Sequence, residues 1–116
     1  MKKAFLICPV RGHSPEETEE VVNDLEAKGY DVHWPHRDTN QDDTAGLDIC
    51  KQNRNAINQA DCVFIVWDGK STGSLFDLGM AFAMKKTLHI IKLPELTEGK
   101  SFQNMMWLWE KMGPND

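Results

Sequence analysis

Two short, almost wholly apolar segments limit the fold more than any other feature of the sequence. Residues 3–9 read KAFLICP, and residues 62–67 read CVFIVW. Runs of this length with β-branched and aromatic side chains are typical of strands that are covered on both faces. Such strands occur in parallel sheets flanked by helices, so these two segments favour an α/β fold.

Strand-like and helix-like patterns alternate along the whole chain. We expect strands over residues 3–9, 30–34, 62–67 and 87–93, helices over residues 14–28, 46–60, 74–86 and 101–112, and a polar loop over residues 37–44. This order predicts a three-layer, doubly wound α/β sandwich of the flavodoxin or Rossmann type, with a parallel sheet of four to five strands. Ligands of such folds bind beyond the carboxyl ends of the strands, which selects the loops 10–14, 35–44 and 68–74.

Length and composition restrict the classes of protein to consider. The 116 residues predict one domain spanning residues 1–116, and the net charge of −5 disfavours a broad nucleic-acid or membrane surface. No apolar run approaches the roughly 20 residues of a membrane span, and the N-terminus does not resemble a signal peptide. Cys8, Cys50 and Cys62 lie in apolar segments without paired spacing, which predicts buried reduced thiols in a cytoplasmic protein.

Asp77 is the one acidic residue in the helix predicted over residues 74–86. Apolar side chains cover every direction of that helix, so we expect it to be enclosed nearly all round. The ordinary explanation of Asp77 is that it complements the helix dipole from the first turn. The alternative is a desolvated carboxylate at a strand-to-helix turn, which is a candidate catalytic group.

Asn53 lies at the centre of an apolar stripe on the helix predicted over residues 46–60. A buried amide needs hydrogen-bond partners. Asn53 is therefore expected to bind either the backbone of the neighbouring loop or a ligand at the mouth of the sheet.

Two loops carry groups suited to an anion. Ser71, Gly73 and Ser74 supply hydroxyls and backbone N–H groups at a helix start, although the same residues would serve as a plain N-cap. Arg11 follows the first strand and can place a guanidinium on a phosphate.

The first predicted helix is a poor anion site by itself. Ser14, Pro15 and Glu17 form a capping-box pattern at its start, and the acidic run 16–20 would repel an anion there. Arg11 would therefore have to supply the attraction. His33 and His36 lack a third ligand, so we predict no metal site and no cofactor. Walker, GxGxxG and GxSxG motifs are absent from the sequence.

Residues 53–92 resemble the nucleoside 2-deoxyribosyltransferase family, including its 2′-deoxynucleoside 5′-phosphate N-hydrolase branch. The likeness rests on "AD" before an apolar strand and on STGSLFDLGMA at residues 71–81, similar to the family pattern S-x-G-x-x-x-E-L-G-x-A. The turn CPVRG at residues 8–12 resembles the N-terminal turn of the N-hydrolase branch. The resemblance implies cleavage or transfer at the N-glycosidic bond of a small nucleoside or nucleoside 5′-monophosphate.

The resemblance also implies roles for individual residues. Asp77 matches the family's glutamate nucleophile, and Asn53 matches its second acid, which helps to protonate the leaving base. Ser71 has the spacing of the branch's phosphate-binding serine, and Arg11 and Gly12 match N-terminal phosphate contacts.

Two departures from the family pattern leave catalysis open. Asp77 is one methylene shorter than glutamate, and Asn53 cannot transfer a proton. Asp68 or Asp38 are candidates to replace the missing acid. The alternative is a non-catalytic nucleotide-binding or sensing protein on the same fold.

The helix predicted over residues 101–112 carries two apolar faces. One stripe at helical spacing is expected to dock this helix on the sheet, and it consists of Phe102, Met105, Met106, Trp109 and Met112. Trp107 and Leu108 point elsewhere. A second apolar face on a small domain predicts a homo-oligomer through this C-terminal helix, and the resembled family is likewise oligomeric.

Overall fold

Four parallel strands form a single sheet in the order β2–β1–β3–β4. The computed structural model describes residues 1–114. The strands are β1 (Lys2–Ile7), β2 (Tyr30–His33), β3 (Cys62–Val66) and β4 (Thr87–Lys92). At the centre of the sheet, Ala4 of β1 pairs with Val32 of β2 on one side and with Cys62 of β3 on the other. The predicted parallel sheet is confirmed, with four strands.

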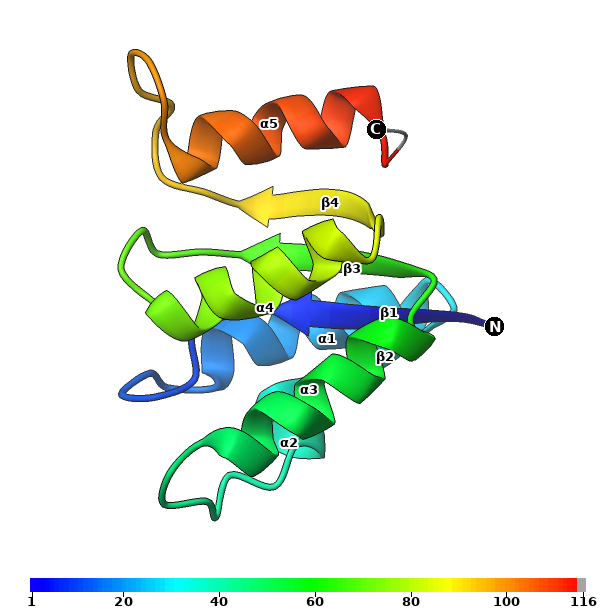
Figure 1. Cartoon of the computed structure of the whole chain (residues 1–116). Coiled ribbons are helices and arrows are strands. Elements are labelled where there is room, and N and C mark those ends of the chain that lie inside the picture. The colour runs from blue at the N-terminus through cyan, green and yellow to red at the C-terminus, as the bar shows by residue number, and fades with distance from the viewer. Residues whose placement is uncertain (115–116) are drawn as a thin grey trace.

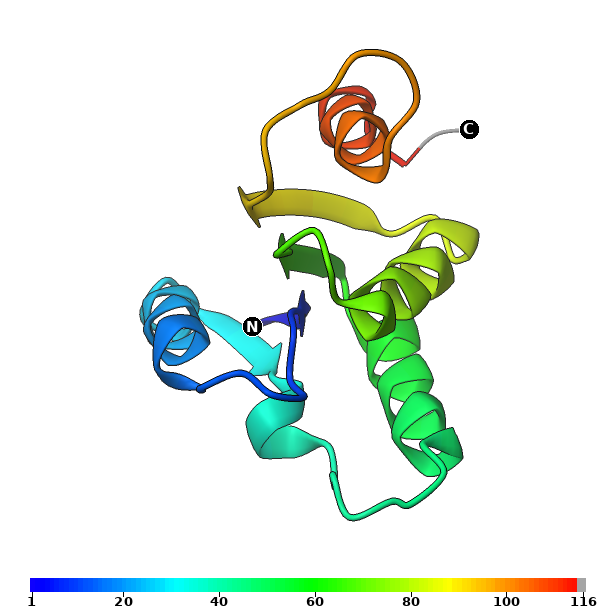
Figure 2. The same ribbon diagram turned by 90° about the vertical axis from the view of Figure 1, so that its left-hand side faces the viewer.

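Helices cover both faces of the sheet, as predicted. They are α1 (Glu16–Ala27), α2 (Pro35–Asp38), α3 (Leu47–Gln59), α4 (Thr72–Ala83) and α5 (Phe102–Met112). Figures 1 and 2 show α1 on one face of the sheet and α3 and α4 together on the other. The strand order reverses after β2, and the later helices α3 and α4 therefore lie on the face opposite α1 (Figure 2). Within residues 1–114, no helix has the length and apolar character needed to cross a membrane.

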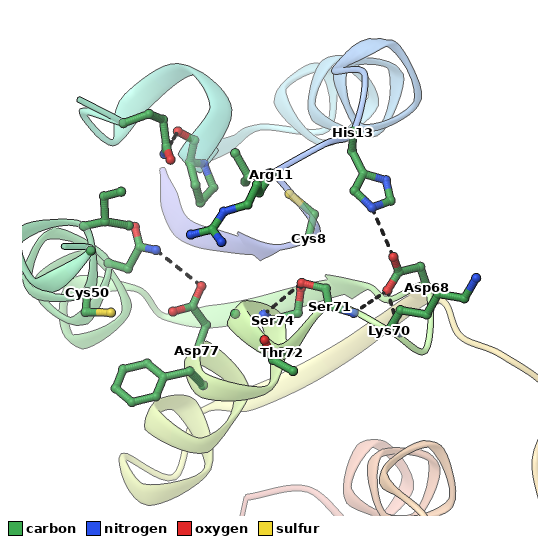
Figure 3. Close-up of a pocket in the computed structure, with 18 residues that line it drawn as sticks. Cys8, Arg11, His13, Cys50, Asp68, Lys70, Ser71, Thr72, Ser74 and Asp77 are labelled. Atoms are coloured by element: carbon green, nitrogen blue, oxygen red, sulfur yellow. Dashed lines mark hydrogen bonds and ion pairs between the residues drawn. The ribbon is translucent and has the colours of Figure 1, made fainter. Parts of the chain in front are cut away.

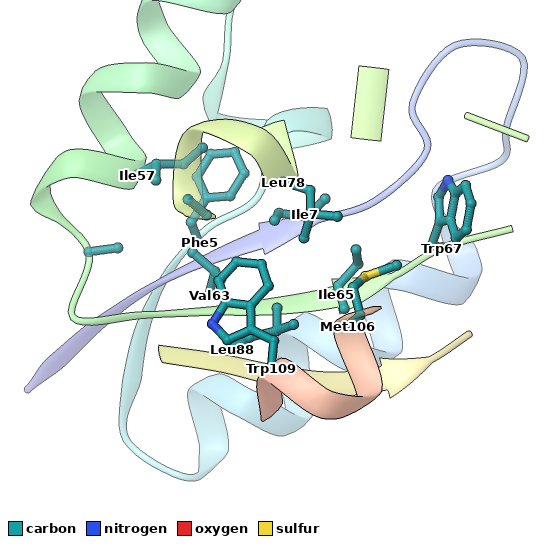
Figure 4. Close-up of a cluster of buried hydrophobic side chains, with 12 residues drawn as sticks. Phe5, Ile7, Ile57, Val63, Ile65, Trp67, Leu78, Leu88, Met106 and Trp109 are labelled. Atoms are coloured by element: carbon teal, nitrogen blue, oxygen red, sulfur yellow. The ribbon is translucent and has the colours of Figure 1, made fainter. Parts of the chain in front are cut away.

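The larger core cluster lies between the sheet and the helices α3, α4 and α5 (Figure 4). Ile57 of α3 and Leu78 of α4 are almost wholly buried against the side chains of Phe5 and Ile7. Burial of each large side chain of this kind contributes roughly 2 kcal/mol. The cluster therefore fixes α3 beside α4, which sets the geometry of the site described below.

The helix α5 lies over the edge of the sheet at β4, as Figure 2 shows. Met106 and Trp109 are buried, and Trp109 Nε1 donates a hydrogen bond to the Lys86 carbonyl over 3.2 Å. The expected docking stripe is too wide, because Phe102 is 50% exposed and Met112 is 76% exposed. A sheet edge buries a narrower strip of a helix than a sheet face does.

The start of α1 differs from the predicted capping box. The helix begins at Glu16, and Ser14 Oγ accepts a hydrogen bond from the Glu16 N–H at 3.4 Å. The reciprocal bond of the capping box is replaced by a bond from Lys92 Nζ to the Glu17 carboxylate at 3.1 Å. Lys92 ends β4, and both partners of this ion pair are exposed.

A short helix, α2, begins two residues before the predicted polar loop and takes up its first two residues. Pro35 occupies its first turn, where the missing N–H costs nothing. Asp38 Oδ2 accepts a bond from the Trp34 N–H at 2.8 Å, which closes the turn. The prediction of an open loop over residues 37–44 is therefore wrong at its start.

All three cysteines are free thiols. Cys8 and Cys62 are buried, as predicted, whereas Cys50 is half-buried. Burial and the nearby Asp77 raise the pKa of the Cys8 thiol to about 12, so this thiol is neutral.

Candidate active site

A cavity of about 780 Å³ opens at the carboxyl end of the sheet (Figure 3). All three loops selected from the sequence contribute to its wall, together with α3 and the first turns of α4. Its volume is in the range of small-molecule sites, roughly 300–1,000 Å³. Predicted residues that line it are Arg11, Asn53, Asp68, Ser71, Gly73, Ser74 and Asp77.

Asp77 lines the cavity from α4 and is only 8% exposed. Burial raises the pKa of its carboxyl to about 7, although the hydrogen bond from Asn53 opposes the shift. The carboxyl therefore changes its charge near neutral pH. The helix begins at Thr72, so Asp77 lies in the second turn and not in the first turn as predicted. The helix dipole consequently explains little of its presence.

The outer side of α4 is exposed, so the prediction of a helix enclosed nearly all round is wrong. Phe76 is 56% exposed and Phe82 is 58% exposed. The helix packs on the sheet and on α3, which buries Leu78 and Ala81 on one side only. Apolar side chains all round a helix need neighbours on every side, and on this outer side the single chain supplies only an edge contact between Phe82 and Trp109 of α5, with 5.2 Å between ring centroids.

Asn53 is buried on α3 and uses its amide on two side chains. Its Oδ1 accepts a hydrogen bond from Thr39 Oγ1 at 2.7 Å, and its Nδ2 donates to Asp77 Oδ2 at 3.3 Å. The expected burial is confirmed, with an exposure of 5%. The amide is bound by side chains instead of by loop backbone, and it joins the candidate nucleophile directly.

Ser71 caps α4 at the other end of the cavity. Its Oγ accepts hydrogen bonds from the Ser74 N–H at 3.2 Å and from the Ser74 hydroxyl at 2.9 Å. The hydrogen of the Ser71 hydroxyl is therefore left for a ligand. Gly73 lies in the first turn and lines the cavity beside Ser71. This end of the cavity offers donors to an anion.

The loop after β1 faces this end of the cavity. Arg11 is an exposed residue in the turn after β1, and its guanidinium extends into the cavity (Figure 3). Gly12 has a positive φ of 74°, which a glycine adopts without strain. Gly12 is not among the residues that line the cavity, so its contribution is to the turn that presents Arg11.

Asp68 holds the turn before α4 and lies at the opposite end of the cavity from Asp77 (Figure 3). Its Oδ1 accepts bonds from the N–H groups of Lys70 and Ser71, both at 2.8 Å, and its Oδ2 pairs with His13 at 3.2 Å. Partial burial raises the pKa of Asp68, but these backbone bonds and His13 hold it below its ordinary value. The structure does not bring Asp68 to Asp77. Asp38, the other candidate acid, is bound to Arg37 and Trp34 outside the cavity wall.

Sequence reasoning missed several residues of the site. Thr39 was part of a polar loop without periodicity, and nothing in that run distinguished it. Ile49, Cys50 and Phe76 form an apolar wall near Asp77. Cys8 also lines the cavity, and its place at the end of a buried strand could have identified it. His33 and His36 bind different groups: His33 Nε2 lies 2.8 Å from Thr39 Oγ1, and His36 Nε2 lies 3.2 Å from the Pro9 carbonyl oxygen.

The solved structures that share this fold include two enzymes. The 2-deoxyribosyltransferase from Bacillus psychrosaccharolyticus has a TM-score of 0.68 and 16% sequence identity, with 90% of each chain covered. The CMP N-glycosidase of Clostridium botulinum has a TM-score of 0.62 and 20% identity, with 90% of this chain and 78% of that chain covered. At these identities the likeness concerns the fold. A search of curated proteins gave no significant match.

The sequence itself identifies the family. The sequence model for nucleoside 2-deoxyribosyltransferases matches residues 5–106, which run from β1 into α5 and include the whole cavity wall. This match confirms the resemblance that the residues around Asp77 indicated. The chain therefore belongs to the nucleoside 2-deoxyribosyltransferase family.

Proposed function

We propose that this protein cleaves or transfers at the N-glycosidic bond of a nucleoside 5′-monophosphate, with Asp77 as the nucleophile. The observation that carries the proposal is the buried Asp77 carboxyl, held by Asn53 on a wall of the cavity. Asp77 Oδ2 is bound by Asn53, whereas Asp77 Oδ1 makes no hydrogen bond with any residue in the range 1–114. One carboxylate oxygen is thus fixed and the other is left for a substrate.

The reaction proceeds in two displacements. Asp77 Oδ1 forms a bond to the sugar C1′ while the C1′–N bond breaks, and the base leaves with the electron pair. Water or a second base then attacks C1′ and releases the Asp77 carboxylate. Asn53 is an amide and transfers no proton, so the leaving base takes its proton from water in the open cavity. Asn53 instead orients the nucleophile.

The phosphate of the substrate binds at the other end of the cavity. The Ser71 hydroxyl, the start of α4 and the Arg11 guanidinium supply donors and positive charge there. The net charge of the chain is −5, so binding depends on these local groups. Asp68 lies next to this end of the cavity. Its carboxylate pairs with His13 and accepts hydrogen bonds from two backbone N–H groups, which reduces its repulsion of a phosphate.

We also propose that the working unit is a homo-oligomer. Phe82 of α4 and Leu108 of α5 are 58% and 51% exposed. A hollow of about 240 Å³ lies beside Phe82 and is lined by Met105, Trp109 and Met112. Contiguous exposed apolar surface of this kind is typical of contacts between subunits. The predicted second apolar face of α5, which consists of Trp107 and Leu108, is exposed, whereas the hollow adds residues of the predicted docking stripe and the exposed side of α4.

Incubation of the protein with ribo- and deoxyribonucleosides and their 5′-monophosphates tests the function, with free base measured by chromatography. Release of base from a monophosphate, lost in Asp77→Asn, is the expected result. One alternative is a protein that binds nucleotides without turnover. It is favoured by Asn53, because this amide cannot transfer a proton to the leaving base. Tight binding by calorimetry with no base released over long incubation would support that alternative and contradict the proposal.

A further inference from the structure

A chain of four polar side chains runs from Asp77 through the interior to β2. Asn53 Nδ2 lies 3.3 Å from Asp77 Oδ2, and Thr39 Oγ1 lies 2.7 Å from Asn53 Oδ1. His33 Nε2 completes the chain at 2.8 Å from the same Thr39 oxygen. Thr39 and Asn53 are 4% and 5% exposed, so bulk water does not compete for their hydrogen bonds.

The chemistry of the four groups fixes the direction of every bond when Asp77 is charged. A carboxylate only accepts hydrogen bonds, so the Asn53 amide must present Nδ2 to Asp77 and Oδ1 to Thr39. Asn53 Oδ1 then accepts the single hydrogen of the Thr39 hydroxyl. The Thr39 oxygen can only accept from His33, which requires a hydrogen on His33 Nε2.

The reverse direction is open only to the protonated form of Asp77. With the proton on Oδ1, Oδ2 still accepts from Asn53 Nδ2, but with the proton on Oδ2 the Asn53 amide would have to turn end for end to accept it. In that turned form Thr39 would donate to His33, whose hydrogen would have to lie on Nδ1. The charged form of Asp77 therefore permits one orientation of the amide and one location of the His33 hydrogen, whereas the protonated form permits both.

We propose that His33 and Thr39 are positioning residues for Asp77, because they lock the Asn53 amide with its Nδ2 toward the carboxylate. Without them, a lone amide has two orientations, and one of them places its oxygen against the carboxylate. The consequence for catalysis rests on the function proposed above, whereas the chain of hydrogen bonds does not depend on it.

The surroundings of the chain suit this role. The His33 ring stacks on Phe5 of β1 with 5.3 Å between ring centroids, which holds its Nε2 toward Thr39. Burial lowers the pKa of His33; the charge of Asp38 opposes this and that of Arg37 adds to it. His33 is therefore neutral near pH 7 and has one ring hydrogen to place.

The cavity wall holds other charged and titratable groups besides Asp77. Cys8 at the end of β1 is a neutral thiol. The remaining groups are Cys50 of α3, and Arg11, His13, Asp68 and Lys70 in the loops after β1 and β3. The variants used in the test leave all of these groups in place, so they share one background.

The test measures the pKa of Asp77 by carboxyl carbon NMR in the free protein, together with the His33 ring nitrogens. Thr39→Val keeps the shape of the side chain and removes the hydroxyl. We expect it to raise the pKa of Asp77 by about 0.5 to 1 unit, since the amide is no longer held toward the charged form. We also expect wild-type His33 to carry its hydrogen on Nε2 at about pH 8. No change in the Asp77 titration, or a hydrogen on Nδ1, would overturn the proposal.

Matched variants separate positioning from loss of structure. Thr18→Val removes another buried hydroxyl, which accepts a bond from Trp34 Nε1, and should leave the Asp77 titration unchanged. His33→Phe keeps a ring on Phe5 and should raise the pKa of Asp77 as Thr39→Val does. His33→Gln should restore the wild-type titration of Asp77, because its amide can donate to Thr39. In the Asn53→Ala background, Thr39→Val should add no further shift. An equal shift in Thr18→Val, or an added shift in the double variant, would contradict the proposal.

The same measurements distinguish this inference from the proposed function. The NMR readouts need no substrate. A shifted Asp77 titration in a protein that releases no base from any nucleotide would support the positioning chain and refute the function. Base release that is unaffected by Thr39→Val, with an unchanged Asp77 titration, would refute the chain alone.

Discussion

Asn53 and Asp77 are 24 residues apart in sequence, and their side chains meet in a buried hydrogen bond of 3.3 Å between α3 and α4. The bond gives the carboxyl a fixed orientation in a place where burial disfavours its charge. Asp77 must be charged to attack as a nucleophile. The buried charge destabilises the folded protein. The consequences can be measured in stability as well as in activity.

Replacement of Asp77 by Asn is expected to stabilise the protein at alkaline pH. The pKa of Asp77 is about 7 in the folded state against 3.8 for an ordinary aspartate, so folding favours the protonated carboxyl. Wild-type stability is therefore greatest at acid pH with respect to this group and falls as pH rises from about 4 through about 7. The full difference is about 4 kcal/mol from the conversion of pKa into free energy. Urea unfolding of both proteins at about pH 5 and pH 8 checks this.

Asp68→Asn is the control for the stability prediction, because its sign is opposite. The pKa of Asp68 is lowered in the folded state, so its charged form adds stability that is lost as pH falls. Asp68→Asn should weaken the protein at neutral pH and approach wild type in acid. If both variants shift the free energy of unfolding in the same direction at about pH 8, the environment assigned to Asp77 is wrong.

The rate of base release should rise with pH and level off above about pH 7, since only charged Asp77 attacks. Asn53→Ala removes the hydrogen bond that lowers the pKa of Asp77, so the inflection should move to higher pH. The profile of kcat/KM against pH for both proteins provides the measurement. An inflection that stays in place in Asn53→Ala would mean that another group controls the rate.

Ser71→Ala should weaken the binding of nucleoside 5′-monophosphates but not that of nucleosides. The loss of one hydrogen bond to a charged phosphate is expected to raise KM for a nucleoside 5′-monophosphate by about tenfold to a hundredfold, with little change for the nucleoside. Ser101→Ala is the matched control, because Ser101 Oγ caps α5 through the Asn104 N–H at 3.1 Å. If Ser71→Ala changed KM equally for the nucleoside and the monophosphate, the phosphate would not bind at Ser71.

The oligomer should depend on the apolar surface shared by α4 and α5. Phe82→Glu and Leu108→Glu place charges on exposed positions of that surface, so they should dissociate the assembly without unfolding the chain. Light scattering during size-exclusion chromatography gives the mass, and circular dichroism checks the fold. A wild-type protein that elutes as a monomer at micromolar concentration would contradict the proposed oligomer.

Local sequence patterns were sufficient to predict the sheet. The apolar runs that became β1 and β3 have no alternative to burial on both faces, and β1 ends shortly before Pro9 and β3 shortly before Gly69. The four-residue helix α2 was missed because it is too short to show a helical period.

All of the predicted site residues except Gly12 and Asp38 line the cavity, but their geometry could not be predicted from the sequence. Asn53 and Asp77 each stood out as a polar residue on an apolar face, but their contact depends on how α3 packs on α4. Asp68 follows β3 at the expected edge of the sheet, but no pattern in the sequence indicated that its Oδ1 would bind the backbone N–H groups of residues 70 and 71. Phe76 and Phe82 are exposed although the helical wheel placed apolar residues all round this helix. The wheel cannot distinguish a side chain buried in the core from an apolar side chain left on the surface.

Identification of the residue that bonds to the sugar is the most direct measurement of the central claim. The protein is mixed with a nucleoside 5′-monophosphate that it cleaves, quenched rapidly in acid, digested and examined by mass spectrometry. We predict a sugar phosphate ester on the peptide that contains Asp77, with no adduct and at least about 10³-fold slower base release in Asp77→Asn. A sugar attached to a different residue, or base release by Asp77→Asn at the wild-type rate, would contradict the assignment of Asp77 as the nucleophile.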